Sequence, residues 1–130
     1  MITGGRIDSI AGKKMSEDQI KGLNINISIE NVKVDGQKIE VGYTYIASYP
    51  DKVGEMTISG VLFADEDKKI AKEVETEWQK SKKIPQIYAE TILNAINYTG
   101  SANGTLLARV LNLSPPLVPP RISLSEAVKK

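Results

Sequence analysis

The side chains that most often carry catalysis are missing from this sequence of 130 residues, because it contains neither histidine nor cysteine. Without histidine the chain lacks the usual general base, proton shuttle and zinc ligand. Without cysteine it has no disulfide framework and no thiol nucleophile. No nucleophile motif frames its serines or lysines, and its glycines match no phosphate-loop spacing. We therefore expect a protein that is not an enzyme and that holds no metal or cofactor.

The most compact acidic group is Asp65, Glu66 and Asp67, at the point where an alternating pattern gives way to a charge-rich one. Three neighbouring carboxylates could bind a divalent cation. They could also complement the positive end of a helix dipole, since the group would end a strand and begin a helix. The sequence favours this second interpretation.

Basic and aromatic side chains give no clear nucleic-acid site. The lysines in 80–83 are typical of a solvated helix end, and the formal net charge is only +1. Trp78 and the tyrosines in 43–49 could stack on bases, but acidic residues surround Trp78, so a core or interface role is favoured. No apolar run is long enough to span a membrane, and no signal peptide is recognisable. We expect a cytoplasmic protein with no nucleic-acid partner and no membrane insertion.

The first half of the chain alternates apolar and polar residues with the period of a half-buried strand. We predict strands over 24–34, 38–49 and 54–64, and a weaker first strand over 6–14. The alternation in the second strand changes parity near Glu30 and Asn31, which predicts a β-bulge. The dipeptide Asp-Gly at 35–36 predicts a tight hairpin. Residues 61–63 are apolar on both sides, which predicts that both faces are covered there.

The second half predicts helices. In 65–83 the apolar residues Ile70, Val74 and Trp78 are spaced for a helix, although the same spacing also fits a strand. Proline 85 suits a first helical turn, and the following residues form a broad apolar stripe up to Gly100. Glycine is common just after a helix, so we expect this helix to end at Gly100 and another to span 104–113. Prolines then hold the chain extended, and these are Pro115, Pro116, Pro119 and Pro120.

Strands followed by helices predict an α+β fold: a four-stranded antiparallel sheet with C-terminal helices packed on one face, in a single domain of residues 1–130. Two or three helices can hardly cover both faces of such a sheet fully within one protomer. The apolar surface that remains predicts oligomerisation, peptide binding, or both.

This order of elements resembles the SecB protein-export chaperones and their SecB-like relatives. The resemblance is carried by "VGYTYIASYPDKVGEMTISGVLFADE" (41–66), "IPQIYAETILNAINYTG" (84–100) and "LSPPLVPPRISL" (113–124). It implies a dimer or tetramer that acts as an ATP-independent holdase, binding unfolded or partly folded polypeptides in apolar grooves, with a possible link to export. Export SecB is strongly acidic where it meets the SecA motor, and this chain, with its near-zero charge, departs from that pattern.

Candidate client-binding residues are the apolar and aromatic side chains of the third strand, the fourth strand and the tail. Because strand residues alternate between faces, one subset must line the core and the other a groove or a subunit contact. An oligomeric adaptor for one specific folded partner is the alternative function, and a ligand site among Tyr43, Tyr45 and Asn94 is a third. The tail either packs on its own helices or forms the rim of a client groove. The client-binding candidates are Tyr43, Tyr45, Ile46, Tyr49, Val61, Phe63, Leu117 and Val118.

Overall fold

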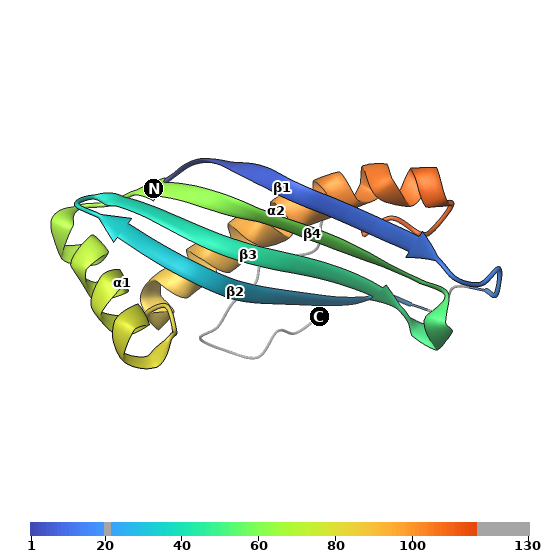
Figure 1. The fold of residues 1–130 in the computed structure, drawn as a ribbon, viewed down its shortest axis with the longest axis horizontal. Coiled ribbons are helices and arrows are strands. Elements are labelled where there is room, and N and C mark those ends of the chain that lie inside the picture. The colour runs from blue at the N-terminus through green and yellow to red at the C-terminus, as the bar shows by residue number, and fades with distance from the viewer. Residues whose placement is uncertain (20–21, 117–130) are drawn as a thin grey trace.

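The computed structural model describes residues 1–19 and 22–116 (Figure 1). Its strands pair antiparallel in the order β1-β4-β3-β2, which confirms the predicted α+β class and the four-stranded sheet. A 3₁₀ turn, η1, joins β3 to β4, and the two helices follow the last strand. The elements are β1 (Ile2–Lys14), β2 (Asn24–Asp35), β3 (Lys38–Tyr49), η1 (Pro50–Lys52), β4 (Gly54–Asp65), α1 (Lys68–Ser81) and α2 (Gln86–Leu111).

The β2–β3 hairpin has the predicted turn and the predicted bulge. Asp35 pairs with Lys38 across a two-residue loop, and Gly36 takes a φ of 64°, a conformation that suits glycine. The register shifts by one residue between Ile29 and Asn31. This shift lets the isoleucines before the bulge and the valines after it face the same side of the sheet.

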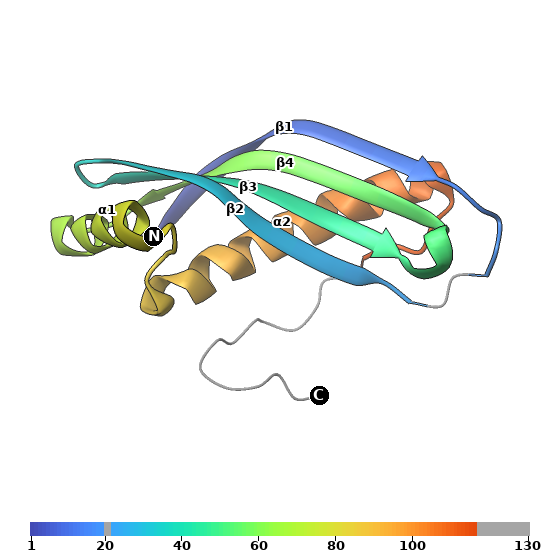
Figure 2. The ribbon, with the colours of Figure 1, turned by 60° about the horizontal axis from the view of Figure 1, so that its bottom comes forward.

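Both helices lie on one face of the sheet, and no other described element covers the opposite face (Figure 2). We call the helix-covered side the inner face and the other side the open face. Along β3 and β4, residues that are buried on the inner face alternate strictly with residues that are partly or fully exposed on the open face. The core therefore consists of one face of the two central strands and the helices beneath it.

Helix α1 forms where the charge-rich segment was predicted to be helical. The Asp67 carboxylate accepts a hydrogen bond from the Ile70 backbone N–H at 2.9 Å, which caps the first turn. Val74 is buried, whereas Ile70 and Trp78 are partly buried against the core. The helix interpretation is confirmed over strand, because all three apolar residues of the stripe contribute to packing.

Helix α2 is one continuous helix, so the prediction of two helices separated at Gly100 was wrong. A Cβ atom built on Gly100 would come 2.3 Å from Cδ2 of Tyr45, and one built on Gly104 would come 2.9 Å from Cγ of Pro116. Both glycines allow close approach of the helix to its neighbours and do not mark its end. The helix ends only at Leu111, where Asn112 adopts a left-handed conformation with a φ of 58°.

Helix α2 runs obliquely beneath the sheet (Figure 1). Gly100 lies against Tyr45 of β3, and near the end of the helix Leu111 lies beneath Gly12 of β1. Since the helix crosses obliquely from the β2 side of the sheet to the β1 edge, it leaves parts of the inner face uncovered along both edge strands (Figure 1 and Figure 2).

Candidate functional site

The structure places the three predicted tyrosines of β3 on the inner face, in the core. Tyr43, Tyr45 and Tyr49 are at most 3% exposed. The Tyr45 hydroxyl lies 3.4 Å from the Ser101 hydroxyl, and the Tyr49 hydroxyl donates to the Ser114 carbonyl. In this chain these side chains hold α2 and the segment after it against the sheet.

The other described candidates lie on the open face. Ile46, Val61 and Phe63 are half-buried there, and the Arg6 guanidinium carbon lies 5.8 Å from the centroid of the Phe63 ring. Among residues 1–19 and 22–116 no element covers Val61 and Phe63, so the predicted cover on both faces of 61–63 is not seen within the described part of the chain. Leu117 and Val118 lie outside the described residues.

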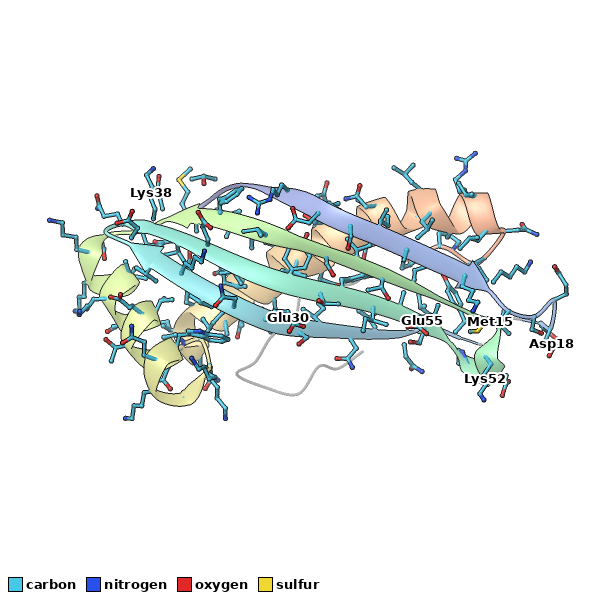
Figure 3. The ribbon with its side chains drawn as sticks, viewed as in Figure 1. Met15, Asp18, Glu30, Lys38, Lys52 and Glu55 are labelled. Atoms are coloured by element: carbon cyan, nitrogen blue, oxygen red, sulfur yellow. The ribbon has the colours of Figure 1, made fainter. Side chains whose placement is uncertain are left out.

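The centre of the open face is lined by small hydroxyl side chains. Ser9 pairs with Ser59, Ser59 with Thr44, and Thr44 with Ser28, so the four form one row across the sheet. The Thr44 and Ser59 hydroxyls lie 3.4 Å apart. Charged residues stand near strand ends, such as Glu55 of β4, and also within strands, such as Glu30 of β2 (Figure 3). The open face therefore has a hydroxyl row at its centre, apolar side chains on either side of that row, and charged side chains such as Arg6 and Glu40 beside the apolar ones.

The inner face is uncovered along β1, where apolar side chains of a strand and a helix reach solvent together. Ile10 on β1 is 48% exposed, and Leu106 and Val110 on α2 are 64% and 79% exposed. Thr99, Leu106 and Val110 are spaced so that they share one side of α2, and Thr99 lies beside residues of β1. We call Ile7, Ile10, Leu106 and Val110 the β1 flank.

A cavity of about 480 Å³ opens next to the β1 flank, between the start of β1 and the middle of α2. Its walls are mostly apolar or uncharged, with Arg6 as the one charged residue among those that line it. Tyr43 and Leu62 are among the residues that line it. A cavity of this size and character would accept an apolar side chain of a partner.

A second uncovered part of the inner face lies along the first half of β2. Ile25 is 38% exposed, and Ile27 and Ile29 are half-buried, all three facing inward. No charged residue occurs in 24–29, although charges follow immediately at Glu30. We call Ile25, Ile27 and Ile29 the β2 flank.

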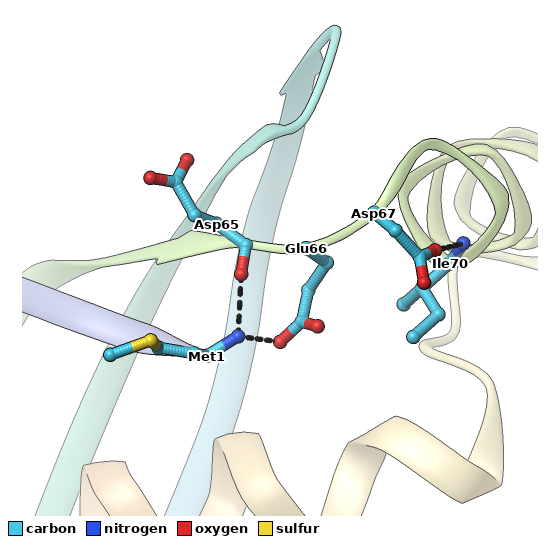
Figure 4. Close-up of polar contacts among 5 residues, drawn as sticks. All are labelled: Met1, Asp65, Glu66, Asp67 and Ile70. Carbon is cyan, nitrogen blue, oxygen red and sulfur yellow. Dashed lines mark hydrogen bonds and ion pairs between the residues drawn. The ribbon is translucent and has the colours of Figure 1, made fainter.

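The acidic cluster has structural roles that its residue types alone did not reveal (Figure 4). The Met1 nitrogen donates to the Asp65 carbonyl and to the Glu66 carboxylate, and Asp67 caps α1. The Asp65 carboxylate lies 4.0 Å from the Lys38 ammonium. Within residues 1–19 and 22–116, three or more His, Cys, Asp or Glu side chains nowhere come together as a metal site. The helix-dipole interpretation is supported, with Asp67 as the residue that acts on the helix.

Burial perturbs the tyrosines of the core. Desolvation raises the pKa of Tyr43, Tyr45, Tyr49 and Tyr88 above the ordinary value. Tyr88 also carries a buried hydroxyl with no hydrogen-bond partner within the described part of the chain. A raised tyrosine pKa keeps these groups neutral, so they act as packing groups and not as bases, and Tyr49 also donates a hydrogen bond.

Comparison with known proteins supports the architecture. No protein-family model matches the sequence, and no curated protein matches it. Among solved structures, the chain is similar to a SecB-like chaperone of Mycobacterium tuberculosis, solved in complex with a ChAD peptide from an antitoxin. The TM-score is 0.63 and the identity 13%, over 95% of this chain and 87% of that chain.

The chain has a SecB-like fold. At 13% identity the similarity shows the fold alone, and it confirms the resemblance that the order of elements suggested. As for the bilayer, neither helix of the described residues combines the length and hydropathy needed to cross it.

Proposed function

We propose that this SecB-like chain is an ATP-independent holdase that binds non-native polypeptides on its apolar surfaces. The observation that carries this proposal is the exposed apolar surface itself, since no described element covers the open face and apolar side chains of both flanks remain exposed to solvent in whole or in part. Exposed apolar patches of this kind mark interaction sites. The M. tuberculosis SecB-like chaperone, whose structure contains a bound peptide, supports a peptide-binding role.

The open face suits an extended chain. Phe63, Val61 and Ile46 are distributed along two adjacent central strands, over a length that a client strand could follow. The hydroxyl row between them can exchange hydrogen bonds with a client backbone, whatever the client sequence. Non-native chains expose apolar side chains along an extended backbone, so this combination favours binding that is broad and not specific for one sequence.

We propose that the β1 flank is a contact between copies of this chain. β1 is an edge strand, and Ile10, Leu106 and Val110 would be buried if a second copy packed there. Long edge strands with exposed apolar side chains favour pairing with another chain. Light scattering at micromolar concentration should show a dimer or a tetramer, and a monomer would count against both this contact and the holdase proposal.

The remaining parts of the proposal follow from the same surfaces. We propose action in the cytoplasm, without catalysis and without a cofactor, because binding needs only apolar contact. A link to export is less favoured, since the acidic residues that the family presents to SecA have no counterpart here beyond 65–67, and these carboxylates have local partners.

Suppression of aggregation tests the holdase proposal. Several unrelated proteins would be unfolded chemically and diluted with and without this protein at a substoichiometric ratio, and light scattering would be followed. We expect slower aggregation of most clients, with no effect of added ATP. Failure with all of them would favour the alternative, an oligomeric adaptor that holds one specific folded partner.

The adaptor alternative is separated from the holdase by selectivity. An adaptor would bind one folded protein tightly and leave unfolded clients alone. A holdase would bind several unfolded clients and release each when it folds. Isothermal titration with native and denatured forms of the same client distinguishes the two, because only the holdase prefers the denatured form.

A further inference from the structure

The three inward-facing tyrosines of β3 differ in how their hydroxyls are satisfied. The Tyr45 and Tyr49 hydroxyls have partners in Ser101 and Ser114. Tyr43 is similarly buried, at 3% exposure, yet its hydroxyl has no hydrogen-bond partner within residues 1–19 and 22–116. Tyr43 is also one of the residues that line the cavity between the start of β1 and the middle of α2. The unpaired hydroxyl therefore belongs to the tyrosine beside the cavity.

The Tyr43 side chain extends from β3 across β4 toward β1. Tyr43, Gly60 and Ile7 form one row across the sheet, with Gly60 in the middle. The hydroxyl oxygen is the Tyr43 atom nearest to a Cβ atom built on Gly60, at 3.0 Å. Since Gly60 has no side chain, it leaves room for the tyrosine, whose hydroxyl end lies on the side of β1. The cavity opens on that same side, so the hydroxyl faces it.

The other walls of the cavity are largely apolar. Ile7 and Leu62 line it, and Arg6 is the one charged residue among its lining residues. The Arg6 guanidinium is engaged elsewhere, because its Nε donates to Asp8 at 2.7 Å and its central carbon lies over the Phe63 ring. The volume of about 480 Å³ is typical of sites that bind small molecules.

The charges near the hydroxyl favour a neutral ligand. Desolvation raises the pKa of Tyr43, and the Asp8 carboxylate raises it further, so the phenol stays protonated and can donate a hydrogen bond. The same negative charge disfavours an anionic ligand beside the hydroxyl. A cation has no counter-ion either, since none of the described residues that line the cavity is acidic. A neutral acceptor such as a carbonyl oxygen fits best.

A free molecule suits this cavity better than a side chain of a bound polypeptide. An apolar side chain would fill the space but would leave the Tyr43 hydroxyl unpaired, and its polar backbone would remain at the mouth. A small molecule can turn its acceptor inward and keep its apolar part against Ile7 and Leu62. Sites built around a buried hydrogen-bonding group discriminate strongly against ligands that lack the matching group.

We propose that this cavity binds a small neutral molecule with an apolar ring and one carbonyl oxygen, which accepts a hydrogen bond from the Tyr43 hydroxyl. Of the ligand site predicted among Tyr43, Tyr45 and Asn94, only Tyr43 lines this cavity. The site is independent of the holdase function, because it needs neither the open face nor a client.

Titration of the full chain with simple carbonyl compounds tests the proposal. Acetophenone, benzamide and cyclohexanone are the probes, ethylbenzene is the analogue without an acceptor, and benzoate is the anionic analogue. Binding is followed by the chemical shifts of backbone amides in 2–7 and 95–103, which border the cavity. We expect at least one carbonyl compound to bind with a dissociation constant of about 1 mM or tighter, and benzoate to bind more weakly.

Tyr43→Phe removes the hydroxyl and keeps the ring, so the variant should fold, and urea unfolding checks this. We expect its affinity for the carbonyl compound to fall roughly five- to tenfold, which corresponds to one neutral hydrogen bond. Its affinity for ethylbenzene should not fall. The proposal is wrong if none of the three carbonyl compounds binds the natural chain, or if Tyr43→Phe weakens ethylbenzene binding as much as carbonyl binding.

A second variant fills the cavity. Ala95 lines it from α2, whereas Ala102 is exposed on the same helix and is not among the lining residues. Ala95→Phe should abolish binding of every probe, and the matched control Ala102→Phe should leave it unchanged. If Ala95→Phe alters only the affinity for an unfolded client, or only the oligomeric state, the cavity belongs to a polypeptide or to a second copy, and the small-molecule site is refuted.

Discussion

Gly100 of α2 lies directly against the ring of Tyr45, so closely that a Cβ atom on the glycine would come 2.3 Å from Cδ2 of the tyrosine and 2.4 Å from Cε2. The missing side chain lets the helix approach the central strand β3, and the Tyr45 hydroxyl then reaches Ser101 one residue further along the helix. This contact fixes where α2 crosses the sheet. It thereby also determines which parts of the inner face stay uncovered.

Replacing Gly100 by Ala should destabilise the protein, although alanine is the better helix former by about 1 kcal/mol. The added methyl group would overlap a buried ring, and overpacking of this kind costs about 1–3 kcal/mol. Urea unfolding measures the change. The exposed Ala102 provides the matched control, because Ala102→Gly should cost only the helix-propensity difference. Stabilisation by Gly100→Ala would show that the helix sits further from the sheet.

Removing the Tyr88 hydroxyl should stabilise the protein. This hydroxyl is buried without a hydrogen-bond partner within the described residues, and such a group costs about 1–3 kcal/mol. We expect a higher unfolding midpoint for Tyr88→Phe. In Tyr49→Phe, by contrast, the bond to the Ser114 carbonyl is lost, and stability should fall by about 1 kcal/mol. If both changes had the same sign, the assigned hydrogen bonding would be wrong.

Stability should fall at alkaline pH. Desolvation raises the pKa of Tyr43, Tyr45, Tyr49 and Tyr88 in the folded chain, so the folded state disfavours the phenolate. The contribution of these tyrosines to the free energy of unfolding is therefore complete below the pKa of about 10 that tyrosine has in the unfolded chain. It is lost as the pH rises from there through the pKa values of the folded state. Urea unfolding over a series from about pH 8 to about pH 11 measures the slope. The Tyr88→Phe variant has one titrating group fewer, so its slope should be shallower.

The cap of α1 can be separated from its neighbouring charge. Asp67→Ala removes the hydrogen bond to the Ile70 N–H and should cost about 1 kcal/mol. Asp65→Ala removes only an exposed ion pair with Lys38 at 4.0 Å, which contributes little. Thermal or urea unfolding of both variants should show a clear loss for Asp67 alone. Equal losses of stability in the two variants would show that the negative charge matters and not the hydrogen bond of Asp67 to the Ile70 N–H.

The two sides of the sheet should separate stability from client binding. Tyr45→Ala opens a cavity beneath β3 and should cost about 3–5 kcal/mol of unfolding free energy. Phe63→Ala alters the open face and should weaken binding of an unfolded client by about 1 kcal/mol or more, with little change in stability. Fluorescence anisotropy with a labelled unfolded client measures the affinity. If affinity tracks stability in both variants, the open face is not a client surface.

The sequence by itself determined the strands, the bulge after Ile29, the hairpin at 35–36 and the class of fold. These features depend on local periodicity and turn chemistry, which act between residues close in the chain. It also determined that the β3 and β4 candidates must divide between two faces, because alternation requires this. Which subset would be buried depended on where the helices pack, and no local pattern contains that information.

Only the tertiary structure decided the roles of Gly100 and Gly104. In sequence a glycine after an apolar stripe indicates a helix end, yet here the chain continues as a helix because close packing against Tyr45 and Pro116 needs a residue without a side chain. The uncovered flanks are likewise a tertiary result, since they arise from the oblique path of one continuous α2. Contacts between residues far apart in the chain decide which apolar side chains fill the core and which remain available to a partner.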